Sequence, residues 1–337
     1  MREAVLYDRK ESGAVKCHLC RHGCLIEDQK KGICGVRQNL AGTLYTLVYD
    51  KVISTNVDPI EKKPLFHFAP GSLSFSIATV GCNFRCSFCQ NYSISQMPHD
   101  RGRIAGESYT PAEIASMALQ AGCKSISYTY TEPTIFYELA RDTMVEAKKH
   151  GLLNVFVTNG YMTRDMLDDA RDLLDAANVD LKAFNDRFYT HYCKAKREGV
   201  MDSLAYMREL GIWVEVTTLL IPTLNDDHGE IRDMARFIRG SLGPGTPWHV
   251  SRFYPQYKEQ DLPPTDVQEL TRVRQIGLEE GLHYVYVGNV PGDPAEKTRC
   301  PGCSYLLVDR VGYTIRRNAI KDGSCPKCGY HIEGRDL

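Results

Sequence analysis

Between residues 73 and 288 the chain alternates short apolar runs with segments whose apolar residues recur at helical spacing. Alternating β and α units of this kind predict a parallel sheet with right-handed crossover connections. Six or seven units favour an α/β barrel or partial barrel of the TIM type, with functional groups at the carboxyl ends of the strands. We expect strands at residues 73–80, 125–130, 154–159, 178–182, 213–221, 248–254 and 283–288.

Two capping boxes mark helix starts within this region. Thr110 is followed by Pro111 and Glu113, which predicts a helix with proline at its first position. Thr265 and Gln268 have the spacing of a second box.

The two ends of the chain differ in pattern from the barrel region. The C-terminal part contains two C-x2-C pairs, and the segment between them alternates as two strands around a turn at Val311–Gly312. The pattern predicts three units: a Cys-rich N-terminal segment (1–70), a partial barrel (71–295) and a four-Cys module of the zinc-ribbon or rubredoxin kind (296–337).

Charge and hydropathy restrict the possible partners. The 337 residues carry a formal net charge of −1, which gives no support for binding nucleic acid or an anionic surface. The N-terminal MREAVLYDRKESG lacks the apolar core of a signal peptide, and no run of about 18 apolar residues predicts a membrane span. We expect a cytoplasmic protein.

Cysteine is the unusual component. The chain has 13 cysteines, and only Cys123 and Cys193 lie outside three clusters. In a cytosolic chain, clustered cysteines indicate metal binding rather than disulfides. Cys123 is expected to be a packing residue, and Cys193 either core filler or a relay thiol for a radical.

The C-terminal cluster has the spacing of a four-thiolate metal site. Its members are Cys300, Cys303, Cys325 and Cys328. Two C-x2-C pairs about 20 residues apart match structural zinc sites, although iron also accepts four thiolates in a tetrahedron. Zinc is the expected ion, in a closed structural site.

The N-terminal cluster leaves two alternatives open. Cys17, Cys20, Cys24 and Cys34 follow a C-x2-C-x3-C-x9-C pattern. Four thiolates suit a small zinc knot, which we favour, but an auxiliary [4Fe–4S] cluster also takes four cysteines at varied spacings.

The middle cluster, GCNFRCSFCQN, contains only Cys82, Cys86 and Cys89. A [4Fe–4S] cluster held by three thiolates keeps one iron open, and an open position distinguishes a catalytic site from a structural one. The amino-carboxylate end of S-adenosylmethionine could chelate that iron, and one electron would then release a 5′-deoxyadenosyl radical. The alternatives are a ferredoxin-like cluster or a zinc site, both of which usually take four ligands.

The C-x3-C-x2-C spacing, with Phe88 before the last cysteine, resembles the radical SAM signature. The resemblance implies a fold of the radical SAM kind and places the Phe88 ring near the adenine. Polar residues after the next strands suit a zwitterionic ligand with ribose hydroxyls: Glu132, Asn159, Asp180 and Lys182. The resemblance implies that Glu132 faces the methionyl ammonium and that Asp180 and Lys182 lie along the cofactor. The alternative is a set of ordinary salt bridges at the barrel mouth.

As a set, the motifs most resemble the radical SAM enzyme of the AmmeMemoRadiSam system, a family related to the pyruvate formate-lyase activating enzymes. They include CHLCRHGC, DPIEKKPLFHF, YTEPT, DLK and WHVSRFYPQY. The resemblance implies an oxidoreductase acting on an unidentified protein or small molecule, an electron donor such as ferredoxin or flavodoxin, and Memo- or AMME-type partners. Unlike several activases, the chain has no further cysteines directly after residue 91.

Two other functions remain open at this point. One is a glycyl-radical-enzyme activase, and the other is a non-catalytic iron–sulfur electron carrier or zinc-ribbon binding module. Among weaker candidates, the segment that carries Lys62, Lys63 and His67 could pack beside the cluster, but two adjacent lysines are more typical of a solvated face. His249 is expected to be a satisfied core histidine.

Overall fold

The computed structural model describes residues 1–337 and is built around one eight-stranded sheet. Its strand order is β16-β15-β14-β13-β12-β11-β9-β8, with all pairs parallel except β8 with β9. The strands are β8 (Ser54–Pro59), β9 (Leu73–Ala78), β11 (Ser125–Tyr128), β12 (Leu153–Thr158), β13 (Ala176–Asp180), β14 (Trp213–Leu220), β15 (Trp248–Arg252) and β16 (Val285–Gly288). Because β8 and β16 do not pair with each other, the barrel is open, as a partial barrel requires. All seven predicted strands are present, whereas β8 was not predicted.

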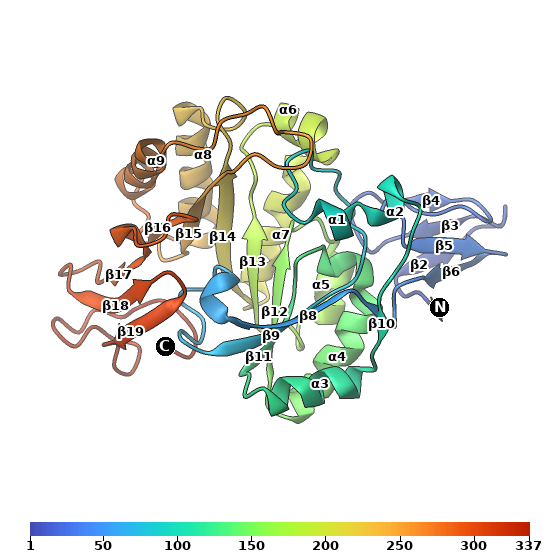
Figure 1. The fold of residues 1–337 in the computed structure, drawn as a ribbon, viewed down its shortest axis with the longest axis horizontal. Helices are drawn as coiled ribbons and strands as arrows, with labels where there is room; N and C mark the ends of the chain where they lie inside the picture. The colour runs from blue at the N-terminus through green and yellow to red at the C-terminus, as the bar shows by residue number, and fades with distance from the viewer.

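Helices cover the outer face of this sheet (Figure 1). The longer ones are α3 (Pro111–Gln120), α4 (Tyr137–Lys149), α5 (Arg164–Ala170), α7 (Arg197–Glu209), α8 (His228–Phe237) and α9 (Val267–Glu279). The short ones are η1 (Ile60–Lys62), α1 (Tyr92–Ser95), α2 (Met97–Asp100), η2 (Pro133–Phe136), α6 (Asp186–Phe188), η3 (Tyr189–Cys193), η4 (Ile238–Leu242) and η5 (Pro294–Glu296).

One predicted helix cap is confirmed and the other is wrong. Thr110 and Glu113 form the capping box of α3, with proline at its start. The cap of α9 is Asp266, whose side chain accepts from the Gln268 amide. Thr265 instead accepts from the Phe253 amide at 2.9 Å, because it is buried in the contact between strand end and helix.

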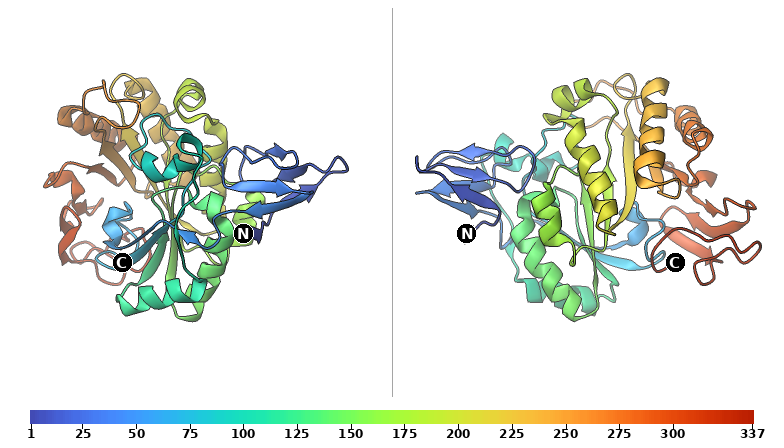
Figure 2. Two further views of the ribbon diagram at one scale, coloured as in Figure 1. Left: turned by 45° about the vertical axis from the view of Figure 1, so that its right-hand side comes forward. Right: turned by 180° about the vertical axis from the view of Figure 1, so that it is seen from behind.

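Small antiparallel sheets form the two ends of the molecule (Figures 1 and 2). The N-terminal end consists of the sheets β1-β6-β5 and β2-β3-β4, and β7 pairs with β10. These strands are β1 (Arg2–Glu3), β2 (Tyr7–Arg9), β3 (Val15–Cys17), β4 (Leu25–Ile26), β5 (Arg37–Leu40), β6 (Thr43–Thr46), β7 (Lys51–Val52) and β10 (Glu107–Ser108).

The C-terminal end is the sheet β17-β18-β19, formed by β17 (Thr298–Arg299), β18 (Leu306–Val311) and β19 (Thr314–Asn318). The β18–β19 hairpin turns at residues 312–313, one residue beyond the start of the predicted turn. Arg310 fixes this sheet to the barrel, because its fully buried guanidinium donates to the Phe66 carbonyl at 2.6 Å and lies 4.3 Å from the Phe66 ring centroid.

No helix in the chain combines the length and the apolar character needed to cross a bilayer.

Candidate active site

The loop that carries Cys82, Cys86 and Cys89 leaves the carboxyl end of β9, where the sequence predicts a functional loop. Gly81 begins it with a φ of +104°, and a side chain there would meet Val36 at 2.7 Å, so only glycine fits. Gln96 donates to the Phe84 carbonyl at 3.1 Å and holds the middle of the loop.

The three thiols lie on the wall of one cavity without forming a single-ion site. The chain has one set of side chains whose ligand atoms all lie within 4.8 Å of one another, and this set is the C-terminal cysteines. Cys82 accepts from the Phe84 amide at 3.3 Å, and Cys89 lies 3.2 Å from the Ser95 hydroxyl. Burial raises the pKa of the Cys82 thiol, so a metal is needed to keep it as a thiolate.

A fourth cysteine, distant in sequence, approaches this loop. Cys193 is fully buried in η3, and its carbonyl accepts from the Arg85 amide at 3.0 Å. Its thiol neighbours that of Cys86 and lowers the pKa of Cys86. Cys123 is buried in the apolar core, as predicted.

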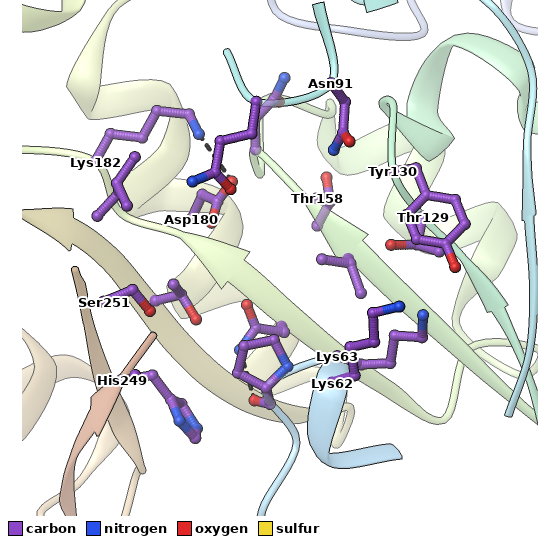
Figure 3. Close-up of a pocket in the computed structure, with 18 of the residues that line it drawn as sticks. Lys62, Lys63, Asn91, Thr129, Tyr130, Thr158, Asp180, Lys182, His249 and Ser251 are labelled. Atoms are coloured by element: carbon purple, nitrogen blue, oxygen red, sulfur yellow. Dashed lines mark hydrogen bonds and ion pairs between the residues drawn. The ribbon is translucent and has the colours of Figure 1, made fainter. Parts of the chain in front are cut away.

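The cavity beside the thiols has a volume of about 540 Å³, within the range of small-molecule sites. All five predicted cofactor residues line it: Phe88, Glu132, Asn159, Asp180 and Lys182. Figure 3 shows its polar walls, with Asp180 and Lys182 on one side and Lys62, Lys63 and Tyr130 across from them.

Glu132, at the end of the second parallel strand, organises one wall of the cavity. Its Oε1 accepts from the Thr134 amide at 3.1 Å and from the Thr158 hydroxyl at 2.6 Å, and its Oε2 accepts from the Asn159 amide at 2.8 Å. Burial raises the pKa of Glu132, although the hydrogen bonds that the carboxylate accepts act to lower it. Because an ionised carboxylate oxygen accepts two hydrogen bonds, Oε2 keeps capacity for one further donor.

Asp180 and Lys182 border the cavity and form an ion pair of 2.8 Å with each other. The salt bridge named as the alternative is therefore present between these two residues. Burial opposes the charge of Lys182, but Asp180 and the nearby thiols outweigh it and raise the lysine pKa. The Lys182 Nζ lies 6.0 Å from the centroid of the Phe88 ring, which packs on Phe188 at 5.5 Å. Asn159 donates to Asn83 at 2.7 Å and so ties its strand end to the cysteine loop.

The segment before β9 forms the opposite wall, which contradicts the expected solvated face. Asp58 and Lys63 make a buried ion pair of 2.6 Å, and the Tyr130 hydroxyl donates to the same carboxylate. These contacts lower the pKa of Asp58 despite its burial, and burial lowers the pKa of Lys63 to about 8. Only Lys62, with 44% of its side chain exposed, behaves as predicted.

Below the cavity a buried carboxylate collects donors from β15 and from the segment before β9. Glu215 accepts from His249 at 2.7 Å, from the His67 amide at 2.7 Å and from the Phe66 amide at 3.0 Å. The contacts with His249 and His67 lower the pKa of Glu215 although burial opposes its charge. His249 is thus a satisfied buried histidine, as predicted, and it also lines the cavity.

The residues present fit an iron–sulfur cluster with a polar organic ligand. Three thiolate donors at one end leave a fourth position to the ligand. Two buried polar atoms that line the cavity, Asn178 Oδ1 and Thr217 Oγ1, have no hydrogen-bond partner in the protein. Buried polar atoms need partners, so these two indicate where a ligand would bind.

Sequence reasoning missed Asp58, Tyr130 and Glu215. A single carboxylate in the apolar run WVEVTTLLI was a usable signal for Glu215, because a central strand rarely buries a charge without a partner. No comparable signal marked Tyr130, which adopts a positive φ of 62° at the cavity wall.

The remaining cysteines form two separate groups. In the C-terminal group the Cys300–Cys328 and Cys303–Cys325 sulfurs lie 3.5 and 3.7 Å apart. The N-terminal four surround a small closed cavity of their own.

Comparison with known proteins gives the chain its relatives. The family model of the radical SAM superfamily matches residues 76–238. The uncharacterized protein MJ0808 of Methanocaldococcus jannaschii is 44% identical over 335 residues, which are 99% of both chains. A putative glycyl-radical enzyme activating enzyme of that organism, MJ1632, is 25% identical over 64% of this chain and 78% of its own. The crystal structure of Streptococcus suis SuiB bound to S-adenosylmethionine shares the fold, with a TM-score of 0.52 at 13% identity over 74% of this chain and 58% of SuiB.

Proposed function

Because the chain belongs to the radical SAM superfamily, which implies a [4Fe–4S] cluster and S-adenosylmethionine, we propose that Cys82, Cys86 and Cys89 ligate that cluster. When bound, the two cofactors supply reductive cleavage of the sulfonium to a 5′-deoxyadenosyl radical, which abstracts hydrogen from a substrate. The observation that carries the proposal is the set of three thiols on the wall of a polar cavity of about 540 Å³, which the neighbouring Cys193 does not line. An electron carrier or binding module would not need such a cavity.

We assign the cofactor end of the cavity to the predicted residues. Glu132 meets the methionyl ammonium through the free capacity of Oε2, and its other hydrogen bonds hold it in place. Phe88 lies against the adenine. Asp180 and Lys182 lie along the cofactor, where their pairing fixes both side chains before binding.

The opposite end of the cavity is left for the substrate. It is lined by Lys62, Lys63, His249, Ser251 and Tyr313, the last of which comes from the C-terminal hairpin. The proposed substrate is a protein or small molecule, reduction comes from a one-electron donor such as ferredoxin or flavodoxin, and Memo- or AMME-type proteins are the proposed partners.

A glycyl-radical-enzyme activase is the second candidate, favoured by the likeness to MJ1632. It uses the same radical chemistry and differs in its substrate, a protein with a glycyl-radical site. Detection of a protein glycyl radical on a partner, by electron paramagnetic resonance, separates it from the first candidate.

We further propose that the C-terminal cysteines bind a structural zinc ion. A tetrahedral ion with Zn–S bonds of about 2.3 Å separates its sulfurs by about 3.8 Å. The 3.5 and 3.7 Å separations in this group agree with that geometry. Four protein ligands leave no open position for chemistry.

The test is anaerobic turnover of the full chain. The protein is reconstituted with iron and sulfide, mixed with S-adenosylmethionine and dithionite, and assayed for 5′-deoxyadenosine. We expect Cys86→Ala to reduce the product to the level of a protein-free blank and Cys123→Ala, a buried cysteine outside all clusters, to leave it unchanged. Product that persists in Cys86→Ala would exclude the proposed function.

A further inference from the structure

The N-terminal end of the molecule contains a second thiol-lined cavity, which the proposed function does not use. Its walls are Cys17, Cys20, Cys24 and Cys34 together with apolar side chains and the guanidinium of Arg37. The void is small, about 20 Å³, which is room for about one water molecule. The arrangement of four thiols from an 18-residue segment around one void is a feature to be explained.

The spacing of these thiols does not suit a single ion. Four sulfurs around one tetrahedral ion lie about 3.8 Å apart, and the C-terminal cysteines come together within 4.8 Å. The N-terminal four are not gathered in this way and surround a void instead. A [4Fe–4S] cubane binds each thiolate at a different iron, so it holds its four cysteine sulfurs farther apart than one ion does, and it takes them at varied sequence spacings.

Arg37 gives an independent indication of what the void holds. Its side chain is 2% exposed, and its Nη1 donates to the Cys17 sulfur at 3.3 Å. Its Nη2 donates to the Glu138 carboxylate and, at 2.8 Å, to the Val5 carbonyl. Its Nε is buried and has no hydrogen-bond partner. A buried N–H group needs an acceptor, and sulfur atoms in the void would supply one. Hydrogen bonds to sulfur are typical of protein-bound iron–sulfur clusters.

From the four thiols around a void and the unpartnered Arg37 Nε, we propose that Cys17, Cys20, Cys24 and Cys34 bind a second [4Fe–4S] cluster. Because the protein supplies all four ligands, no iron is open, and this cluster binds neither S-adenosylmethionine nor substrate. The zinc knot favoured by the sequence is thereby replaced by the alternative that the sequence left open.

The second site packs directly against the loop of the first. A side chain at Gly81 would meet the Cys34 carbonyl at 3.2 Å and Ile135 at 3.5 Å, and Ile135 also lines the N-terminal void. His22 lies 2.8 Å from the Asn83 carbonyl through its Nε2. Loss of the N-terminal cluster is therefore expected to loosen the cysteine loop as well. The iron of the N-terminal cluster has to be counted in a variant that lacks the first cluster.

The test uses the full chain with Cys82, Cys86 and Cys89 all changed to Ala, reconstituted anaerobically with iron and sulfide. We expect this triple variant to retain about four iron and about four sulfide per chain, half of the wild-type content. Its dithionite-reduced paramagnetic signal should not change when S-adenosylmethionine is added. Iron near zero, together with a second zinc ion per chain, would overturn the proposal in favour of a zinc knot.

Two further changes in the triple variant locate the remaining iron. Cys20→Ser should remove or strongly deplete it, whereas Cys123→Ser should leave it unchanged. Iron that survives Cys20→Ser at full content would also overturn the proposal. The proposed function fails separately: the wild type would then form no 5′-deoxyadenosine even though the triple variant still holds its cluster.

Discussion

The C-terminal cysteine group and the cysteine loop after β9 both present thiols, but they differ in number, spacing and surroundings. Four sulfurs of the first group lie within 4.8 Å of one another, against apolar residues such as Leu307 and Ile332. Three sulfurs of the second border a cavity of about 540 Å³, most of whose lining residues are polar or charged. Four thiolates of the first arrangement would close the coordination of one ion, and the three thiolates of the second would leave a position to a ligand.

The surroundings follow from this difference. A closed site needs only packing around it, and the C-terminal cysteine group lies in a small buried apolar cluster. An open site needs oriented polar groups, and the fold supplies them as buried ion pairs such as Asp58–Lys63 and Glu215–His249. Buried charges are costly to desolvate, and both carboxylates here have more than one hydrogen-bond partner.

The largest expected effect separates the structural role of one region from the chemical role of the other. In Cys325→Ser/Cys328→Ser, the C-terminal module should lose its ion and unfold, because zinc contributes roughly 10–16 kcal/mol to small zinc-dependent folds. Amide hydrogen exchange should show complete loss of protection in β18 and β19. Cys86→Ala should keep that protection, and equal loss in both variants would contradict the comparison.

Asp58→Asn tests how far the cavity wall depends on its ion pairs. The variant leaves Lys63 buried without its carboxylate, and breaking a buried pair costs about 3–5 kcal/mol. Denaturant unfolding measures the loss. Glu146→Gln, which breaks an exposed pair with Lys149 of 2.7 Å, should change stability by less than about 1 kcal/mol. A loss as small as that of the control would mean that the Asp58 pair does not stabilise the wall.

Periodicity predicted the parallel strands because each is buried on both faces and reads as a continuous apolar run. The edge strand β8 has exposed positions and is polar, and it is a strand only through its antiparallel pairing with β9, with Val57 opposite Phe75. That pairing depends on tertiary contact, which local sequence does not encode.

In the site, thiol number and strand-end position were sufficient to identify residues that line the cavity. The wall across from them was misread, because two consecutive lysines are typical of a solvated face and only the fold brings Asp58 and Tyr130 to Lys63. Strand alternation likewise did not decide whether His249 or Arg252 faces the interior. The structure places His249 in the cavity, and Arg252 donates to the Thr265 carbonyl at 2.8 Å.

Glu132→Gln should weaken S-adenosylmethionine binding by about 10- to 100-fold, because a hydrogen bond to a charged group contributes about 1.5–3 kcal/mol. Equilibrium binding to the reconstituted protein measures the effect. Thr158→Val is the matched control, since it removes one 2.6 Å hydrogen bond of the same carboxylate but keeps the charge. Both variants should lose some stability, but only Glu132→Gln should lose most of its affinity. Equal affinity loss would assign Glu132 a purely structural role.

The smallest expected effect concerns the joint between the two regions. His67 Nδ1 lies 2.6 Å from the Glu333 carbonyl of the C-terminal end, and its Nε2 lies 2.6 Å from the Tyr286 hydroxyl of β16. A neutral ring that donates to the carbonyl and accepts from the hydroxyl satisfies both contacts. Burial lowers the pKa of His67 to about 4, whereas an unfolded histidine titrates near 6.5.

The unfolded chain therefore binds the His67 proton more tightly, and the stability present above about pH 6.5 is lost as the pH falls towards 4. Between about pH 6.5 and about pH 5.5 this histidine should contribute a loss of about 1 kcal/mol. Denaturant unfolding at the two pH values should show a shallower pH dependence for His67→Gln than for the wild type. His150→Gln, a change at an exposed histidine, should keep the wild-type dependence. If His67→Gln keeps it as well, the acid sensitivity of the molecule lies outside this joint.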